Sequence, residues 1–329
     1  MSTCPKQHAI CVDMGTTNTR VWLVCGDEIV LRTQKKIGVK VATKEGSTRR
    51  ILKQMVAEVL AQGAEAHQPE CIAAAGMITS DLGLKEISHI PAPAGLNEIV
   101  RASECHHFRD ISNLPFLLVP GVSTVATKNS IQDVMRGEET LCLGLISSGL
   151  LNPPGVVLNL GSHWKAIEVD SHARIGSSVT SLSGELIDAA RRQTVLASSL
   201  PQKFPEELCW KWIEAGMSES RFAGLPRTLF RVRLLELNKE VNAEERLAFL
   251  VGAFIASDLD ALVARGMFSH QQVVISGHRA IAESWGRALQ QKSIPVSMLN
   301  TEQSERAFLK GLQQVVNAVR TETFNSALA

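Results

Sequence analysis

The pattern of apolar and polar positions predicts two β-hairpins of the same design in different halves of the chain. Residues 10–24 form an apolar run, a polar turn opened by Gly15 and a second apolar run, and residues 156–169 repeat that order around Gly161. This arrangement is typical of paired strands joined by a tight turn. The repeat favours a duplicated architecture with two similar α/β lobes, although two unrelated hairpins would also match in this way.

Other segments supply the helices and strands of such lobes. Apolar residues recur at the helical period in three segments, which we expect to be helices: 47–63, 243–265 and 304–320. Three short apolar runs end in Gly or Pro-Gly turns and predict strands: 71–75, 116–119 and 273–276. Ligands of open α/β sheets usually bind where strands end. Residues 200–240 show no pattern that assigns them.

Residues 140–164 contain no Asp, Glu, Lys or Arg, a composition that is also found in membrane-spanning helices. The motif Asn152-Pro153-Pro154-Gly155 divides this stretch, so we predict a buried helix at 141–151, a turn and a buried strand. The apolar run at 9–12 is interrupted by Asp13 and is too short for a signal peptide. We therefore expect a cytoplasmic protein without a membrane partner.

The charges and cysteines narrow the classes of partner. The 329 residues carry 34 Lys and Arg against 33 Asp and Glu, which gives a net charge of +1 and a pI near 7.7. A nucleic-acid partner usually requires a basic surface, so none is expected and any bound anion must be held locally. The seven cysteines include no CxxC pair, which argues against a zinc cage and a disulfide framework. The chain has no tyrosine to act as a general acid.

The turn of the first hairpin has the residue types that bind a phosphate and a metal. Gly15 lets the backbone approach closely, the hydroxyls of Thr16 and Thr17 can contact phosphate oxygens, and Asp13 can hold hydrated Mg²⁺. An ordinary threonine-rich turn would contain the same residues. Two such hairpins facing each other could hold a polyphosphate from both sides, with Lys165 either as an added cation or as a solvated strand-end lysine.

An acidic cluster precedes the apolar helix expected at 141–151. It contains Asp133, Glu138 and Glu139 together with Arg136. Carboxylates at a helix N-terminus are favoured by the helix dipole, which is the simple explanation. Alternatively, one acid accepts the proton of a substrate hydroxyl while Arg136 pairs with an anionic group, as in a kinase. Spacing alone does not choose among the three acids.

Further segments give weaker indications. The turn at 276–278 follows an apolar strand and could admit a flat ring such as adenine, but glycine turns of this kind are common. Small residues at 73–80 and in the rigid loop 90–95 indicate either a substrate pocket or a tight helix–sheet junction. The histidines at 106–107 lack a second set of metal ligands at usable spacing, and no GxSxG motif supports a serine hydrolase.

The two hairpins and the late Ser-Gly turn resemble the phosphate-1, phosphate-2 and adenosine motifs of the actin, hexokinase and heat-shock chaperone ATPase superfamily. Within that superfamily, four segments resemble the 2-dehydro-3-deoxygalactonokinases: 75–78, 119–121, 134–140 and 183–186. The Arg-Gly-Glu-Glu-Thr sequence at 136–140 is the most specific of them, and the similarity extends from Ile10 to the final helix. Met14 and Leu160 depart from the family pattern.

This resemblance implies an α/β fold with two actin-like lobes of duplicated, ribonuclease H-like design and a cleft between them. Residues 1–151 would form the first lobe, with the last helix at 305–329 packing back on it. Residues 152–304 would form the second lobe, which carries the second phosphate hairpin and the adenosine turn. The implied reaction transfers the γ-phosphoryl group of ATP to the 6-hydroxyl of 2-dehydro-3-deoxy-D-galactonate, with Mg²⁺, in D-galactonate degradation.

The resemblance also assigns roles to residues at matching positions. The expected catalytic residues are Asp13, Arg136, Glu138 and Glu139, with Asp13 as the metal ligand. The ATP phosphates would be bound by Gly15, Thr16, Thr17, Asn18, Arg20, Gly161, Ser162, His163 and Lys165. The adenosine would be bound by Ser276, Gly277 and His278, and the sugar acid by Gly76, Met77, Ser80, Pro91 and Arg136.

Other functions stay open from the sequence. The chain could phosphorylate a related 2-keto-3-deoxy sugar acid, release phosphate as a hydrolase of the same superfamily, or bind a sugar as a non-catalytic sensor. The sequence does not fix the stereochemistry of the sugar or the oligomeric state, and a homodimer is one assembly that we consider.

Overall fold

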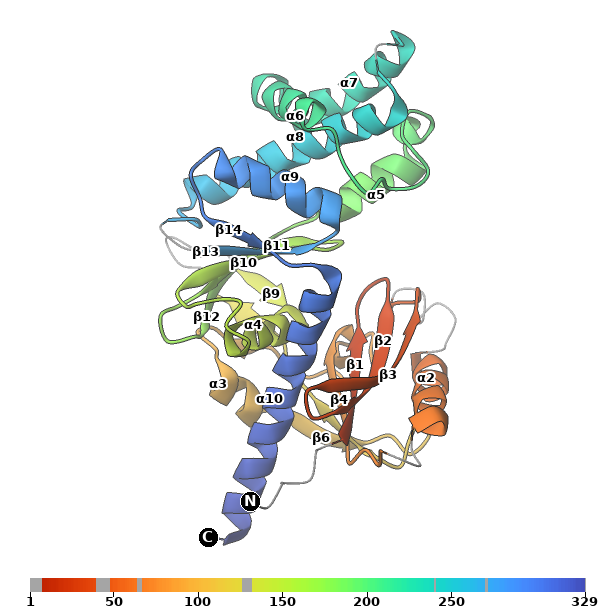
Figure 1. The fold of residues 1–329 in the computed structure, drawn as a ribbon, viewed down its shortest axis with the longest axis vertical. Coiled ribbons are helices and arrows are strands. Elements are labelled where there is room, and N and C mark those ends of the chain that lie inside the picture. Colours follow the sequence, from red (N-terminus) through yellow and green to blue (C-terminus); the bar gives the residue numbers. More distant parts are fainter. Residues whose placement is uncertain are drawn as a thin grey trace.

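Two β-sheets with helices packed against them form the two lobes of the protein (Figure 1). The structure is a computed structural model that describes residues 8–39, 48–63, 67–125, 132–239, 241–269 and 272–328. In Figure 1 the N-terminal strands lie in the lower lobe, and most helices of the later chain lie in the upper lobe. The predicted α/β fold with two lobes is therefore confirmed.

The first sheet has six strands in the order β3-β2-β1-β4-β7-β6. Their bounds are β1 His8–Met14, β2 Thr19–Cys25, β3 Glu28–Lys35, β4 Ile72–Gly76, β6 Glu104–His107 and β7 Pro115–Leu118. Strand β1 pairs antiparallel with β2 and parallel with β4, which confirms the first predicted hairpin. Helix α2 (Thr48–Gly63) covers one face of this sheet with its apolar stripe, which comprises Ile51, Leu52, Met55, Val56 and Val59.

The second sheet repeats this plan with five strands in the order β12-β11-β10-β13-β14. Their bounds are β10 Gly155–Leu160, β11 Trp164–Val169, β12 Ile175–Ser181, β13 Gln272–Gly277 and β14 Val296–Met298. Strand β10 pairs antiparallel with β11 and parallel with β13, as β1 does with β2 and β4. The helices of this lobe lie above the sheet in Figure 1: α5 Ser183–Gln193, α6 Trp210–Ala223, α7 Leu225–Leu237, α8 Ala243–Ala264 and α9 Arg279–Gln290.

A small sheet lies where the two lobes meet. It consists of β5 Ile90–Pro91, β8 Val122–Thr124 and β9 Asp133–Met135 and is accompanied by α3 Leu96–Ala102, α4 Glu138–Ser147 and the short 3₁₀ helix η1 Met77–Thr79. Asp133 on β9 accepts hydrogen bonds from Ser178 Oγ (2.7 Å) and Thr180 Oγ1 (2.8 Å), both on β12. Ala94 also forms a β-bridge with Ile175 at the start of β12. Backbone and side-chain bonds therefore join the small sheet to the second lobe.

Helix α10 (Thr301–Leu328) contacts both lobes. Near its start, Ser304 Oγ lies 3.0 Å from Ser276 Oγ on β13 of the second sheet. The helix then runs down beside the first sheet (Figure 1), where Leu312 packs in one cluster with Trp22 of β2. It covers the face of the first sheet opposite α2, since Trp22 and the apolar residues packed on α2 belong to different clusters. The lobe boundary between residues 151 and 152 stays a prediction.

Helix α8 is the one described helix that is long and apolar enough to cross a membrane, and 67% of its most apolar window is buried in this fold. It packs closely on α6 because glycines stand at the contact. A Cβ at Gly216 would lie 1.9 Å from the Phe249 carbonyl oxygen, and one at Gly252 would lie 2.1 Å from the Ile213 carbonyl oxygen. The apolar composition of α8 is therefore that of a core helix.

The structure changes the bounds of one expected helix, contains the expected strand after it, and assigns helices to a region that had no prediction. The apolar helix expected at 141–151 begins at Glu138 and ends at Ser147, so the acidic residues that precede the apolar run form its first turn. The buried strand expected after the Pro-Pro turn is present as β10. Residues 200–240, which had no assignment, contain α6 and α7, and α7 has a proline in its first turn.

Candidate active site

The ends of the two hairpins match position by position. Asp13 near the end of β1 pairs across the hairpin with Arg20, and Asn159 near the end of β10 pairs with Lys165. The internal repeat that the sequence predicted is therefore present as two hairpins in equivalent positions of two sheets. Their charges differ, because the acid of the first hairpin is replaced by a neutral amide in the second.

Two glycines with positive φ lie beside these hairpins. Gly76 ends β4 with φ 86°, and a Cβ there would lie 2.8 Å from the Met14 carbonyl oxygen. Gly277 ends β13 with φ 148°, and a Cβ there would lie 2.7 Å from the Leu160 carbonyl oxygen. Side chains are strained in this part of conformational space, whereas glycine is not. The predicted sugar-acid residue Gly76 and the predicted adenosine residue Gly277 are thus equivalent positions of the two lobes.

The turn of the first hairpin is closed by its own backbone. The Gly15 N–H donates to the Asn18 carbonyl oxygen (2.9 Å), and the Val39 N–H donates to the Gly15 carbonyl oxygen (3.1 Å). Asn18 Nδ2 donates to Thr17 Oγ1 at 3.1 Å. Thr17 is exposed and Thr16 is half-buried, so both predicted phosphate residues lie at the surface of the turn.

One carboxylate oxygen of Asp13 is paired with Arg20, and the other lies beside Gly76. Its Oδ2 accepts a hydrogen bond from Arg20 Nη1 at 3.0 Å. A Cβ at Gly76 would lie 3.5 Å from Oδ1, so the glycine keeps the space beside that oxygen open. Burial raises the pKa of Asp13, Arg20 acts to lower it, and the negative charge of Glu138 raises it further. Glu138 is therefore close enough to Asp13 to affect its charge.

The first turn of α4 is held against the end of β4. A Cβ at Gly137 would lie 3.4 Å from the Cα of Gly76. Glu139, in that first turn, is fully buried, and its two carboxylate oxygens accept from the Gly137 N–H at 2.9 and 2.7 Å. One of them also accepts from Thr140 Oγ1 at 3.1 Å. Burial, and then the charge of Glu138, raises the pKa of Glu139 to about 7.

Lys165 of the second hairpin reaches the first turn of α4. Its Nζ lies 3.7 Å from Glu138 Oε1 and donates to the Val134 carbonyl oxygen at 2.7 Å. The other oxygen of Glu138 accepts from the Arg136 N–H at 3.2 Å. The Lys165 side chain is 5% exposed and that of Glu138 is 18% exposed. The alternative that Lys165 is a solvated strand-end lysine is therefore wrong.

Arg136 is held by the segment around η1. Its guanidinium donates to Thr79 Oγ1 (3.0 Å) and to the Ile87 carbonyl oxygen (2.6 Å), and it lies 3.4 Å from His89 Nδ1. Burial lowers the pKa of His89, and the charges of Arg136 and Lys165 lower it further. Thr79 lies in the segment 73–80 that the sequence indicated as a possible pocket, although no role was predicted for it. His89 was missed, because a single histidine has no motif that would have identified it.

The turn of the second hairpin packs against the start of α5. A Cβ at Gly184 would lie 2.3 Å from the Gly161 carbonyl oxygen and 2.7 Å from that of Ser162. His163 Nε2 lies 3.0 Å from Glu185 Oε2. The Ser-Gly-Glu-Leu segment at 183–186 thus supports the predicted phosphate turn from behind.

Several predicted residues make contacts that differ from their expected roles. The Ser80 hydroxyl donates to the Met77 carbonyl oxygen at 2.7 Å. The His278 ring packs on Phe204 with 4.8 Å between ring centroids. Pro91 is exposed on β5, and Asp133 has an oxygen occupied by the two hydroxyls of β12. These contacts give Ser80 and Asp133 a local structural function.

Opposite charges from both lobes thus gather at one place. The carboxylates are Asp13, Glu138 and Glu139, and the cations are Arg20, Arg136 and Lys165. Carboxylates of this kind can hold a divalent cation and accept a proton, and cations at fixed positions can neutralise a phosphate chain. The arrangement has the charged groups that a phosphoryl-transfer reaction requires.

Comparison with known proteins gives a consistent result. A family model described as 2-keto-3-deoxy-galactonokinase matches residues 13–315. The 2-dehydro-3-deoxygalactonokinase of Escherichia coli K12 is 26% identical over 312 residues, which covers 94% of this chain and 98% of that enzyme. A protein named as a probable 2-dehydro-3-deoxygalactonokinase from Rhizobium meliloti is 28% identical over 308 residues and covers 93% and 96% of the two chains.

Solved structures share the fold. A crystal structure of a protein described as a 2-dehydro-3-deoxygalactonokinase from Sinorhizobium meliloti superposes with a TM-score of 0.77 at 23% identity, and covers 94% of this chain and 96% of that one. The activator of 2-hydroxyisocaproyl-CoA dehydratase from Clostridium difficile, solved with bound ADPNP, has a TM-score of 0.50 at 9% identity and covers 96% and 97%. Both likenesses concern the fold alone.

Proposed function

The chain belongs to the 2-keto-3-deoxy-galactonokinase family, and we propose that it transfers the γ-phosphoryl group of ATP to the 6-hydroxyl of 2-dehydro-3-deoxy-D-galactonate in D-galactonate degradation. Members of this family are phosphotransferases that use ATP and a sugar acid as substrates. The observation that carries the proposal is the contact of Lys165 from one hairpin with Glu138, next to Asp13 of the other hairpin.

The two turns would bind the polyphosphate from opposite sides. Amides and hydroxyls of the first turn, at 15–18, would contact one side of the polyphosphate. Those of the second turn, at 161–163, would contact the other side. Lys165 and Arg20 would neutralise the phosphate charge, as fixed cations do in phosphoryl transfer. The adenosine would lie beside 276–278 at the end of β13, in the position equivalent to the end of β4.

Asp13 fits the role of a magnesium ligand. Its Oδ1 faces the space that Gly76 leaves, while Arg20 holds Oδ2 in place. Mg²⁺ prefers carboxylate oxygens together with water and substrate phosphates, and when bound it neutralises charge that develops on the transferring phosphoryl group. Asp13 would thus position the Mg²⁺ that neutralises this charge. Glu138 lies near enough to add negative charge to the same site.

We assign the general base to Glu138 and a positioning function to Glu139. A base must come within hydrogen-bond distance of the substrate hydroxyl, and Glu138 retains solvent access whereas Glu139 is fully buried. Both oxygens of Glu139 are engaged by the Gly137 N–H, which fixes the turn that presents Glu138. Glu138 would accept the proton of the hydroxyl as the phosphoryl group is transferred.

Arg136 is placed to bind the carboxylate of the sugar acid. It donates two hydrogen bonds to Thr79 and Ile87, and a guanidinium has five N–H donors in all. Its remaining donors can face a substrate anion, with His89 beside it. Thr79 and Ile87 would then set the direction of the guanidinium.

The cellular setting is part of the proposal. The enzyme would act in the cytoplasm on small molecules, without a nucleic-acid or membrane partner, as a monomer or a homodimer. The first lobe would comprise residues 1–151 with the last helix at 305–329, and the second lobe residues 152–304. Substrate binding would close these lobes so that the sugar hydroxyl, and not water, receives the phosphoryl group.

A coupled ADP-release assay tests this function. Turnover should require Mg-ATP together with the galactonate-derived keto-deoxy acid, and should be slower with the gluconate-derived isomer. Phosphate release without any sugar acid would instead indicate a hydrolase. Binding of the acid by calorimetry without product would indicate a sensor. Product analysis by phosphorus NMR would reveal transfer to a position other than the 6-hydroxyl.

A further inference from the structure

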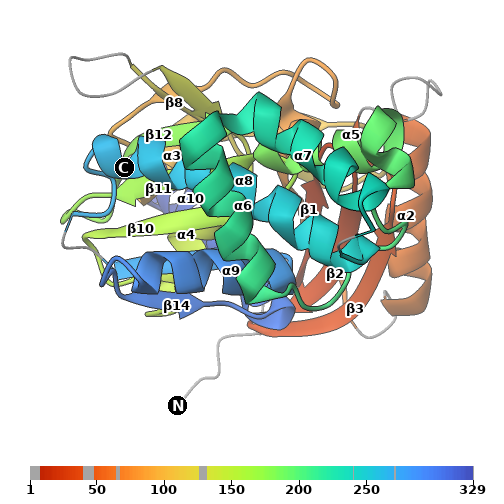
Figure 2. The ribbon, with the colours of Figure 1, turned by 90° about the horizontal axis from the view of Figure 1, so that it is seen from above.

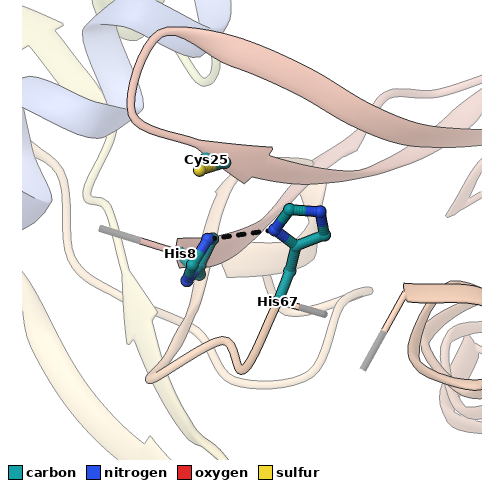
Figure 3. Close-up of side chains that lie close together, drawn as sticks. All are labelled: His8, Cys25 and His67. Atoms are coloured by element: carbon teal, nitrogen blue, oxygen red, sulfur yellow. Dashed lines mark hydrogen bonds between the residues drawn. The ribbon is translucent and has the colours of Figure 1, made fainter. Parts of the chain in front are cut away.

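His8, Cys25 and His67 lie close together (Figure 3), and this cluster of potential metal ligands is at the opposite end of β1 from Asp13. His8 begins β1, Cys25 ends β2, and His67 lies in the segment that follows α2. One donor atom from each residue lies within 4.8 Å of the other two. Because a strand rises about 3.3 Å per residue, His8 is about 17 Å from Asp13 along β1. The cluster is therefore distinct from the proposed active site.

The spacing of the donor atoms suits a tetrahedral ion. His8 Nε2 and His67 Nδ1 lie 3.1 Å apart, a contact that is marked by the dashed line in Figure 3. Two imidazole nitrogens bound to one Zn²⁺ at about 2.0–2.1 Å are about 3.3 Å apart in a tetrahedron. Imidazole and thiolate are the donors that zinc prefers. Small side-chain shifts are enough to bring the three atoms to bonding distance.

The backbone holds the three residues together without a metal. His8 and Cys25 are direct cross-strand partners in the first hairpin. The Glu70 N–H donates to the His8 carbonyl oxygen (3.1 Å), and the His67 N–H donates to the Gly63 carbonyl oxygen at the end of α2 (3.0 Å). The site is thus preorganised by a hairpin register and by the connection from α2, so little ordering would be required on binding.

A hydrogen bond between the two imidazole rings explains part of this arrangement. The rings meet at 62° with 4.9 Å between centroids, and one N–H can donate to the other nitrogen. That bond does not involve Cys25, whose side chain points into the same space and is 6% exposed. A third donor of a different chemical type next to the pair favours a metal site over a simple pair.

We propose that His8, Cys25 and His67 bind one Zn²⁺, with water as the fourth ligand. The three residues belong to the first strand, the second strand and the segment after α2. The ion would tie the hairpin to the end of α2 at the edge of the first lobe. It would stabilise the fold and take no part in phosphoryl transfer.

Metal analysis of the full-length, tag-free protein tests the site. After chelation and addition of Zn²⁺, gel-filtered protein should contain one zinc per chain by plasma mass spectrometry. Cobalt-substituted protein should show a sulfur-to-cobalt charge-transfer band. Cys25→Ser and His67→Gln should each weaken zinc binding at least about 100-fold, and Cys25→Ser should abolish the band. Cys105→Ser removes an exposed thiol of β6 and serves as the matched control with unchanged binding.

The melting temperature distinguishes a zinc site from a simple hydrogen bond between His8 and His67. Zinc should raise the melting temperature of the wild type and of Cys105→Ser, and should have no such effect in His67→Gln. His67 is half-buried in a connecting segment, so His67→Gln decides the question even where Cys25→Ser fails to fold. The proposal is overturned if wild-type protein retains no stoichiometric zinc, or if His67→Gln binds zinc as tightly as the wild type.

Discussion

The two hairpins use the same backbone but distribute charge in different ways. In the first hairpin, Asp13 faces Arg20 across the strands, and the ion pair closes within the hairpin. In the second hairpin, Asn159 occupies the position of the acid, so Lys165 faces no carboxylate across the strands. Its ammonium group instead reaches Glu138 of α4 and the Val134 carbonyl oxygen of β9, where the two lobes meet.

This difference shows how two copies of one backbone motif can acquire different chemical properties. One hairpin places its acid beside Gly76, where we propose that Mg²⁺ binds, and the other places its cation beside Glu138. The glycine positions that open the strand ends are retained in both lobes, as Gly76 and Gly277. The repeated backbone provides two equivalent turns. They differ in the residue opposite the cation, which is an acid in the first hairpin and an amide in the second, and the second cation contacts Glu138 instead.

The largest expected effect comes from making the first hairpin resemble the second. Asp13→Asn should lower kcat about 100- to 1000-fold, because the carboxylate proposed to hold the Mg²⁺ that neutralises the transferring phosphoryl group is lost. The coupled ADP-release assay at saturating Mg-ATP and sugar acid measures this. Asp27→Asn removes an exposed acid of the same sheet and should leave turnover unchanged. Wild-type turnover in Asp13→Asn would show that this hairpin does not hold the metal.

The second prediction concerns how the free energy of unfolding depends on pH through the carboxyl group of Glu139. The pKa of Glu139 is about 7 in the fold against 4.5 ordinarily, so the folded state keeps a proton that the unfolded chain has lost between these values. The free energy of unfolding should therefore fall as pH rises from 5 to 8, by roughly 2 to 3 kcal/mol from this residue. Glu139→Gln binds no proton and should lack this decrease.

Urea unfolding at several pH values measures that difference. Glu302→Gln, at an exposed acid of α10, is the matched control and should keep the wild-type slope. Equal pH dependence in the wild type and in Glu139→Gln would mean that the carboxyl of Glu139 does not titrate near neutral pH.

A smaller effect is expected from cutting the link between the lobes. Lys165→Met removes the cation beside the partly buried Glu138 and should destabilise the fold by about 2 kcal/mol, less than for a fully buried pair because Glu138 keeps some solvent access. The double variant Lys165→Met/Glu138→Gln should recover part of that loss, since no uncompensated charge is left. Additive effects in this double-mutant cycle would show that the two groups do not interact.

Local patterns predicted the elements well. The hairpin at 10–24 and helix α2 follow from runs of apolar residues within one segment, and both are present. The start of α4 was misplaced because Glu138 and Glu139 interrupt the apolar pattern while they occupy its first turn. Short-range sequence signals of this kind do not separate a capping acid from a loop acid.

Long-range contacts could not be predicted in the same way. Nothing in the sequence indicates that Thr79 and Ile87 hold Arg136, because those bonds join segments that meet only in the folded sheet. The cluster of His8, Cys25 and His67 is also without a spacing motif, and the cysteine pattern had argued against a zinc site. The hairpin register and the end of α2 bring these residues together.

Helix α10 makes the completion of the first lobe depend on a segment that is synthesised after the second sheet. Its residues Phe308, Leu309, Leu312, Val315 and Val316 cover one face of the first sheet. The strands of that sheet leave the ribosome early, but the helix that buries Cys11 and Trp22 follows after the whole second lobe has been made. About 200 residues separate the end of β7 from residue 316, so at roughly 5–20 residues per second this delay is about 10–40 s. During that time the face is available to chaperones, so nascent chains should bind them until residue 316 has emerged.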